Sequence, residues 1–257
     1  MDLLYNVPML NTEVATVPAS PVVAVSEISA EEKRRRLFEL ALVLLVAFGG
    51  ALGNAIYLYM HRPGAMQNTG NARWIMGVVQ EGTSLLLLSY VLSRRGLKFC
   101  DLGFRWSFKG AGVGLLLMFV AYLAYGIGFG FIHFLSRGGL SGSSFSGHSA
   151  NDYFGHASFM AIPFALLNPF FEELIVRAYL MTEVLDLTGS ATLAVFLSVG
   201  IQTSYHLYYG WERALSLSFG FLILALYYLR KRQAFPLITA HAVNDVLGIL
   251  RLMRLGA

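Results

Sequence analysis

The chain is poor in charged residues and contains a single cysteine. Charged side chains make up 13% of its 257 residues, whereas 56% are hydrophobic. This balance is too apolar for an ordinary soluble domain of this length. Cys100 alone excludes an internal disulfide and a zinc-thiolate cluster. No glycine-rich nucleotide-binding fingerprint is present, and the net charge of +4 indicates a membrane loop bias, so no nucleic-acid partner is expected.

Long apolar stretches dominate the sequence instead. Several approach the roughly 20 residues that cross a bilayer as a helix. They cover about residues 37–60, 74–92, 110–135, 157–181, 191–209, 214–229 and 235–250. We therefore predict an all-α, polytopic bundle of about seven transmembrane helices, with the lipid bilayer as a partner. Residues 1–32 are predicted to form a flexible tail, and residues 33–257 a single transmembrane domain.

Basic residues are distributed unevenly between the predicted loops. Lys33–Arg36, five basic residues from Arg94 to Lys109, and Arg230–Arg232 all fall on one side of the membrane. Loops that are rich in lysine and arginine remain in the cytoplasm. We therefore expect a multi-pass protein of the cell membrane with a cytoplasmic N-terminus.

The predicted fourth span contains three charged residues, Glu172, Glu173 and Arg177. Charged groups at bilayer depth are costly, and they face a bundle interior or a water-filled cavity. On an α-helix Glu173 and Arg177 share a face, so a structural ion pair explains them both. Glu172 is rotated by about 100° from its neighbour. It has no assigned cation and is predicted to act as a general base.

Two later spans carry histidines. His206 lies near the end of the fifth span, and His241 lies in the last. Asn244 and Asp245 follow His241 by three and four residues, so both lie near its face. Polar groups between membrane helices also serve as interhelical hydrogen-bonding partners. Carboxylates and imidazoles that meet inside a membrane are typical of water-activating hydrolysis, a metal site or a proton path.

These motifs, in this order, resemble the CPBP family, which comprises the type II CAAX prenyl endopeptidases and the bacterial Abi proteins. They are Glu172-Glu173-x-x-x-Arg177, then His206, then His241-x-x-x-Asp245. The resemblance covers about residues 110–250, the predicted protease core. The second motif of the family usually reads Phe-x-x-x-His, and here Gln202 takes the phenylalanine position. This replacement alters the packing or polarity around His206, but it leaves the set of residues that the resemblance implies are catalytic unchanged.

The resemblance implies an intramembrane endopeptidase that hydrolyses a membrane-associated peptide or protein without a covalent intermediate. It implies that Glu172 and His206 position and deprotonate a water, and that His241 with Asp245 stabilises the oxyanion. An ionised aspartate cannot donate a hydrogen bond, so neighbouring Asn244 is the alternative donor. Glu173 and Arg177 are expected to support the site.

Other functions use the same residues. A zinc ion could be held by Glu172, His206 and His241, but no His-Glu-x-x-His pair is present, so no cofactor is expected. A proton-coupled transporter would use these groups as a relay, although no inverted repeat is visible. A non-catalytic or bacteriocin-immunity protein would not require the acid–base set.

The predicted spans place the site residues at different depths. Counting 1.5 Å per residue from the cytoplasmic face puts Glu172 at about 13 Å, His241 at about 9 Å and His206 at about 21 Å. Residues that act on one water must lie together. The difference therefore requires helix tilt or a misplaced span boundary.

Overall fold

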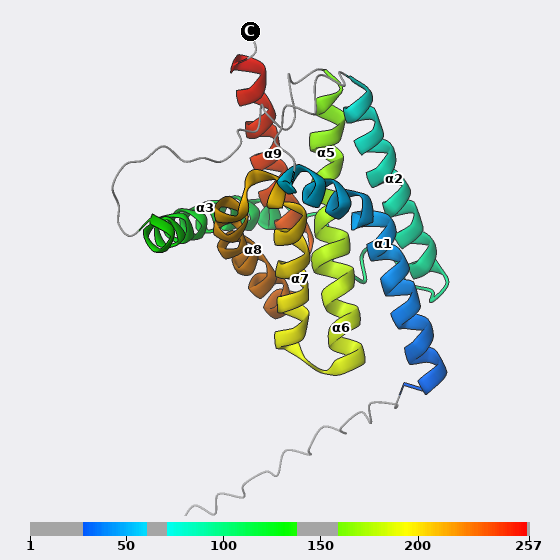
Figure 1. Ribbon diagram of the computed structural model, residues 1–257. Helices are drawn as coiled ribbons and strands as arrows, with labels where there is room; N and C mark the ends of the chain where they lie inside the picture. The colour runs from blue at the N-terminus through cyan, green and yellow to red at the C-terminus, as the bar shows by residue number, and fades with distance from the viewer. Residues whose placement is uncertain (1–27, 61–70, 138–158, 256–257) are drawn as a thin grey trace, which may run out of the picture.

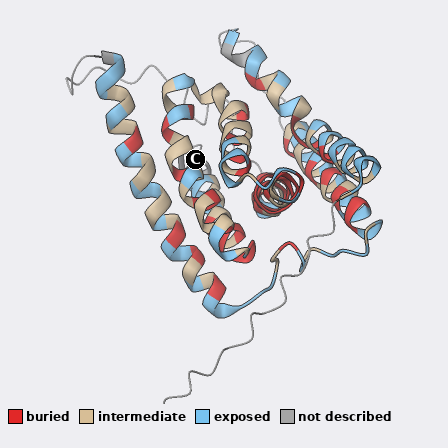
Figure 2. Cartoon of the chain, turned by 90° about the horizontal axis from the view of Figure 1, so that it is seen from below, coloured by how far each residue is buried: buried red, intermediate tan, exposed pale blue. Residues whose placement is uncertain are grey.

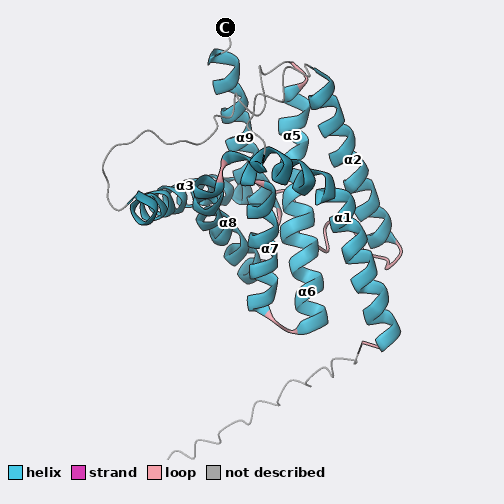
Figure 3. Cartoon of the chain, viewed as in Figure 1, coloured by secondary structure: helices cyan, strands magenta, loops and turns pink. Residues whose placement is uncertain are grey.

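The computed structural model describes residues 28–60, 71–137 and 159–255, and within these ranges all regular structure is helical. Figure 3 shows the described residues as helices linked in part by short loops, with no strand among them. In chain order they are α1 (Ala30–Met60), α2 (Asn71–Ser93), α3 (Phe108–Arg137), α5 (Ala161–Glu172), η2 (Glu173–Tyr179), α6 (Leu180–Thr188), α7 (Ala191–Tyr205), η3 (Leu207–Tyr209), α8 (Trp211–Lys231) and α9 (Phe235–Leu255). The predicted all-α fold is confirmed.

Four of the described helices are long and apolar enough to cross a membrane. They are α1, α2, α3 and α8, and α7 is a shorter apolar helix. Large hydrophobic side chains such as Leu86, Phe119 and Phe131 are exposed on these helices, as expected for surfaces that face lipid. The protein is therefore a helical membrane protein. The predicted N-terminal tail lies mostly outside the described residues, and residues 30–32 already belong to α1.

The central element is a single rod formed by α5, η2 and α6, which follow one another without a break (Figure 1). Every residue from 171 to 181 is buried. Seen from below in Figure 2, a mostly buried helix stands on end between its neighbours. The segment η2 is a π-helix. A π-helix has i→i+5 hydrogen bonds and occurs frequently at functional sites.

A tight turn joins α6 to α7. Gly189 ends α6 in the left-handed conformation (φ 68°), and Ser190 Oγ caps α7 by accepting from the Leu193 amide at 3.2 Å. The two helices therefore run antiparallel from this turn. Glu172 precedes Thr188 by 16 residues, and His206 follows Ser190 by 16 residues. Both lie about 24 Å from the turn at 1.5 Å per residue.

This arrangement corrects the predicted fourth span. The helix does not end near Met181 but continues to Thr188, which places Glu172 at the level of His206. The additional turns carry two charged residues, Glu183 and Asp186. Their charges are neutralised by arginines that lie far away in the sequence.

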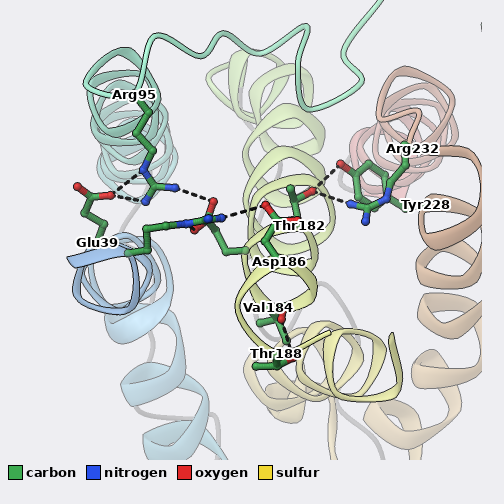
Figure 4. Close-up of polar contacts among 10 residues, drawn as sticks. Glu39, Arg95, Thr182, Val184, Asp186, Thr188, Tyr228 and Arg232 are labelled. Atoms are coloured by element: carbon green, nitrogen blue, oxygen red, sulfur yellow. Dashed lines mark hydrogen bonds and ion pairs between the residues drawn. The ribbon is translucent and has the colours of Figure 1, made fainter. Parts of the chain in front are cut away.

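An ion-pair network surrounds Glu183 of α6. The Glu183 carboxylate is buried and accepts from Arg36 Nε and from an Arg95 terminal nitrogen, both at 2.8 Å. Arg36 also contacts Asp186 at 3.0 Å, and Arg95 contacts Glu39 (Figure 4). Burial lowers the pKa of Arg95, but hydrogen bonds to Glu39 and Glu183 outweigh it and raise this pKa. The network ties together α1, α6 and the loop after α2.

The loop after α2 also holds the turn between α8 and α9. The Gly103 carbonyl accepts from the Ala234 amide at 3.0 Å, and the Leu102 carbonyl accepts from the Tyr228 hydroxyl at 3.1 Å. A Cβ on Gly103 would lie 2.0 Å from the Arg232 carbonyl oxygen. Because of this contact α9 begins inside the bundle, where Phe235 is buried. The start of α9, and with it His241, is therefore held against the loop after α2.

Candidate active site

The site lies where the junction of α5 and η2 meets α7 and α9. Glu172 is the last residue of α5 and Glu173 the first of η2, and both carboxylates are buried. His206 caps the C-terminal end of α7, and His241 lies in the second turn of α9. The structure thus brings together the residues that the motifs single out.

His241 is surrounded by three carboxylates. Its Nδ1 lies 3.0 Å from Glu173 Oε1, a hydrogen bond that fixes the ring. Its Nε2 lies 3.5 Å from Asp245 Oδ1 and 4.0 Å from Glu172 Oε2. Acidic groups this close stabilise a positive charge on the imidazole and leave Nε2–H pointing into the site.

The predicted pairing of Glu173 with Arg177 is loose. Arg177 Nε lies 3.8 Å from Glu173 Oε2, and neither atom has a hydrogen-bond partner among the described residues. The prediction assumed an α-helix, on which residues four apart align. In the π-helix that they form part of, Glu173 Oε1 lies 3.0 Å from His241 Nδ1, and Arg177 donates to Ser198 Oγ. Glu173 therefore turns to α9 and Arg177 to α7.

Arg177 is fully buried and has its closest contacts on α7. It donates to Ser198 Oγ at 3.2 Å and to Gln202 Oε1. The Phe221 ring lies 5.7 Å from the guanidinium and adds a cation–π contact. These partners hold the cation in place more firmly than the glutamate does.

Gln202 connects Arg177 to the predicted base. Its Oε1 accepts from Arg177, so its Nε2 faces Glu172 and donates to Oε2 at 2.7 Å. An arginine only donates hydrogen bonds, and this fixes which way the amide points. The residue that departs from the family motif is therefore a polar link and not a packing residue.

The same residue also orients His206. The Gln202 carbonyl accepts from His206 Nδ1 at 2.8 Å. Since a carbonyl only accepts, Nδ1 carries the proton, and Nε2 of the neutral ring is left as an acceptor. Aromatic rings of Tyr205 and Phe221 lie about the imidazole, with centroids at 4.8 Å and 5.1 Å.

Asp245 is held by amides on both sides. Asn168 Nδ2 donates to Asp245 Oδ2 at 2.9 Å and lies 3.5 Å from His241 Nε2. Asn244 Nδ2 faces Asp245 at 3.4 Å, while its Oδ1 accepts from the Tyr122 hydroxyl at 2.6 Å. Sequence reasoning assigned no role to Asn168. Its position four residues before Glu172, on the same helix face, was the available signal.

Glu81 of α2 is a second residue that sequence reasoning missed. Its side chain is buried, and Oε2 has no hydrogen-bond partner among the described residues. Its carboxyl interacts electrostatically with Glu172, His241 and Asp245. A carboxylate within an apolar stretch is the same signal that identified Glu172.

The side chains that could act as zinc ligands can be compared with the requirements of a metal site. Across the three described ranges, no group of three or more histidine, cysteine, aspartate or glutamate side chains is arranged to hold a metal ion. His206 and His241 each use Nδ1 for a hydrogen bond within the protein. The expectation that no cofactor is needed stays a prediction.

A buried set of carboxylates and histidines inside an apolar helix bundle is typical of a functional site in a membrane protein. A family model described as type II CAAX prenyl endopeptidase Rce1-like matches residues 154–247, which include every predicted site residue. Over this segment the chain is similar to the family of CAAX proteases that its motifs resemble. Curated proteins and solved structures gave no match.

Proposed function

We propose that the protein is an intramembrane endopeptidase that hydrolyses a peptide bond of a membrane-associated peptide or protein. The observation that carries the proposal is the convergence of Glu172, His206 and His241 within the matched segment. Gln202 and Glu173 hold these three side chains in defined orientations.

Glu172 and His206 activate the attacking water. Glu172 Oε2 is fixed by Gln202, and His206 Nε2 is available as an acceptor. A water between them loses a proton to Glu172 as its oxygen attacks the carbonyl carbon of the peptide. The proton then passes to the leaving amine as the carbon–nitrogen bond breaks, so the carboxylate is restored.

His241 stabilises the negative charge that develops on the carbonyl oxygen. Its Nδ1–H is bound to Glu173, which leaves Nε2–H of the charged ring for the oxyanion. Three nearby carboxylates compensate the charge of the ring. Removal of one such donor typically costs about 3 to 4 kcal/mol of transition-state stabilisation.

The test uses two peptides that end in Cys-aliphatic-aliphatic-X, one farnesylated on the cysteine and one not. The purified protein in detergent is incubated with each, and the products are identified by mass spectrometry. We expect the last three residues to be released, and a preference for the farnesylated peptide would support a prenylated substrate.

Glu172→Gln keeps the shape of the side chain but removes the base, so turnover should fall at least about 100-fold. The proposal would be contradicted if neither peptide is cleaved, or if Glu172→Gln cleaves a peptide as fast as the parent protein does.

A further inference from the structure

We propose that Asn168 is a catalytic residue, which donates a hydrogen bond to the oxyanion together with His241. This inference rests on the proposed function and names the amide donor of that site. The two donors considered from the sequence, Asp245 and Asn244, are both engaged elsewhere.

Asp245 acts as an acceptor in this site. Its Oδ2 accepts from Asn168 at 2.9 Å, and its Oδ1 faces Asn244 Nδ2 at 3.4 Å and His241 Nε2 at 3.5 Å. Asn244 is held by Tyr122, which donates to its Oδ1 at 2.6 Å and turns its amide nitrogen to Asp245. The carboxylate of Asp245 has no N–H to offer, and the amide nitrogen of Asn244 is directed to Asp245 and not to His241 Nε2.

Asn168 does offer such a donor. Because a carboxylate only accepts, the contact with Asp245 fixes the NH₂ group of Asn168 towards the site. One N–H is used by Asp245, and the second remains beside His241 Nε2, 3.5 Å from the nitrogen. Two nitrogen donors at this separation can both lie about 2.7–3.1 Å from a single oxygen, as an oxyanion site requires.

The position of Asn168 also relates the oxyanion to the base. Asn168 and Glu172 lie one turn apart on α5, so their side chains share a face. Glu172 Oε2 is 4.0 Å from His241 Nε2, the other proposed donor. A carbonyl oxygen held by Asn168 and His241 would therefore present its carbon to a water on Glu172. Because Asn168 and Glu172 lie on the same short stretch of α5, this helix would fix the position of the oxyanion donor relative to that of the base.

Moving the amide from one helix to the other tests the proposal. Asn168→Ala and Asn168→Asp both remove the donor, so kcat on the cleaved peptide should fall about 100- to 1,000-fold with little change in KM. The double variant Asn168→Asp/Asp245→Asn exchanges the two side chains. The carboxylate then lies on α5, and the amide beside it is supplied by α9. We expect this variant to recover kcat to within about tenfold of the parent protein.

Tyr122→Phe is the matched control. It removes the hydroxyl that holds Asn244 and leaves Asn168 untouched. We expect an unchanged kcat, whereas a donor role for Asn244 would make kcat fall. Thermal unfolding of each purified variant separates loss of fold from loss of chemistry, and the exchanged variant decides the question if Asn168→Ala does not fold.

Parent-like kcat in Asn168→Ala would overturn the inference while leaving the proposed function intact. So would an exchanged variant that is as stable as the parent but as inactive as Asn168→Asp. If the parent protein cleaves neither the farnesylated nor the unmodified peptide, the proposed function fails, and the role of Asn168 fails with it.

Discussion

At the scale of single residues, Gln202 determines how the base and its histidine are held. Its side chain joins Arg177 to Glu172, and its carbonyl orients His206. A phenylalanine in this position could provide none of the side-chain contacts. Arg177 therefore influences the orientation of Glu172 indirectly, through the side chain of Gln202.

Replacing Gln202 tests this dependence. Gln202→Leu has a similar volume but leaves Glu172 without its donor, so kcat should fall at least about tenfold with KM unchanged. Buried Arg177 also loses an acceptor, which should cost about 1–3 kcal/mol of stability. Steady-state kinetics and denaturant unfolding measure the two effects.

Ser198→Ala serves as the control for this variant. It removes the other hydrogen bond of Arg177 but leaves Glu172 and Gln202 in place. It should lose stability but keep the kcat of the parent. If both variants lose kcat equally, the role of Gln202 is merely to support Arg177.

Arg177 itself is predicted to be structural. Arg177→Ala removes a fully buried cation, leaves Gln202 Oε1 without its donor and breaks the ion pair with Glu173. Removing one partner of a buried ionic network typically costs about 3–5 kcal/mol. The variant should therefore show a lower unfolding temperature and a lower yield in detergent. A stable but inactive protein would instead assign Arg177 to the catalytic set.

The types of the site residues could be predicted from the sequence, but several of their partners could not. Glu172, His206 and His241 stand out because ionisable groups are costly in apolar spans. The predicted Glu173–Arg177 ion pair is present at 3.8 Å, but nothing in the sequence signals the π-helix that contains it or the further partners of both residues on α9 and α7. Asn168 was missed because the direction of a side chain depends on the packing of α5 against α9, which are far apart in the chain.

At the scale of elements, the contact between the loop after α2 and the α8–α9 turn sets the height of α9. Gly103 has a positive φ of 83° and lies directly against the Arg232 carbonyl. The start of α9, and with it His241, is placed by this close approach. The sequence showed a basic loop here but gave no sign that it supports the site.

Gly103→Ala should therefore destabilise the protein. A Cβ would meet backbone at 2.0 Å, which forces the turn to move, and the positive φ adds strain. Gly96→Ala is the control, because Gly96 also has a positive φ (69°) but open space around it. Thermal unfolding should show a clearly larger loss for Gly103→Ala. An equal loss would mean that backbone strain alone is responsible.

The end of the central rod shows a second limit of sequence reasoning. Glu183 and Asp186 resemble loop residues because isolated charges are expelled from a membrane. In the structure Arg36 neutralises both, from a helix more than a hundred residues earlier. Helix boundaries in this protein thus depend on long-range ion pairs.

At the scale of the whole molecule, we predict hydrolysis without a resident metal. The family resemblance and the lack of His-Glu-x-x-His spacing favour water activation by the protein alone. Elemental analysis of the active protein should find no stoichiometric zinc, and a chelator should leave peptide cleavage unchanged. One zinc per chain, with activity lost on its removal and restored on its return, would replace this mechanism.

The ion-pair network has a consequence for how the chain is made. Arg36 and Arg95 leave the ribosome well before Glu183, because synthesis proceeds from the N-terminus. The early helices therefore enter the membrane with two cations whose shared partner does not yet exist. Completion of α6 supplies that partner and joins the early and late parts of the chain. A nascent chain that stops before residue 183 therefore lacks the carboxylate that links Arg36 of α1 to Arg95 of the loop after α2, and synthesis of Glu183 completes this link.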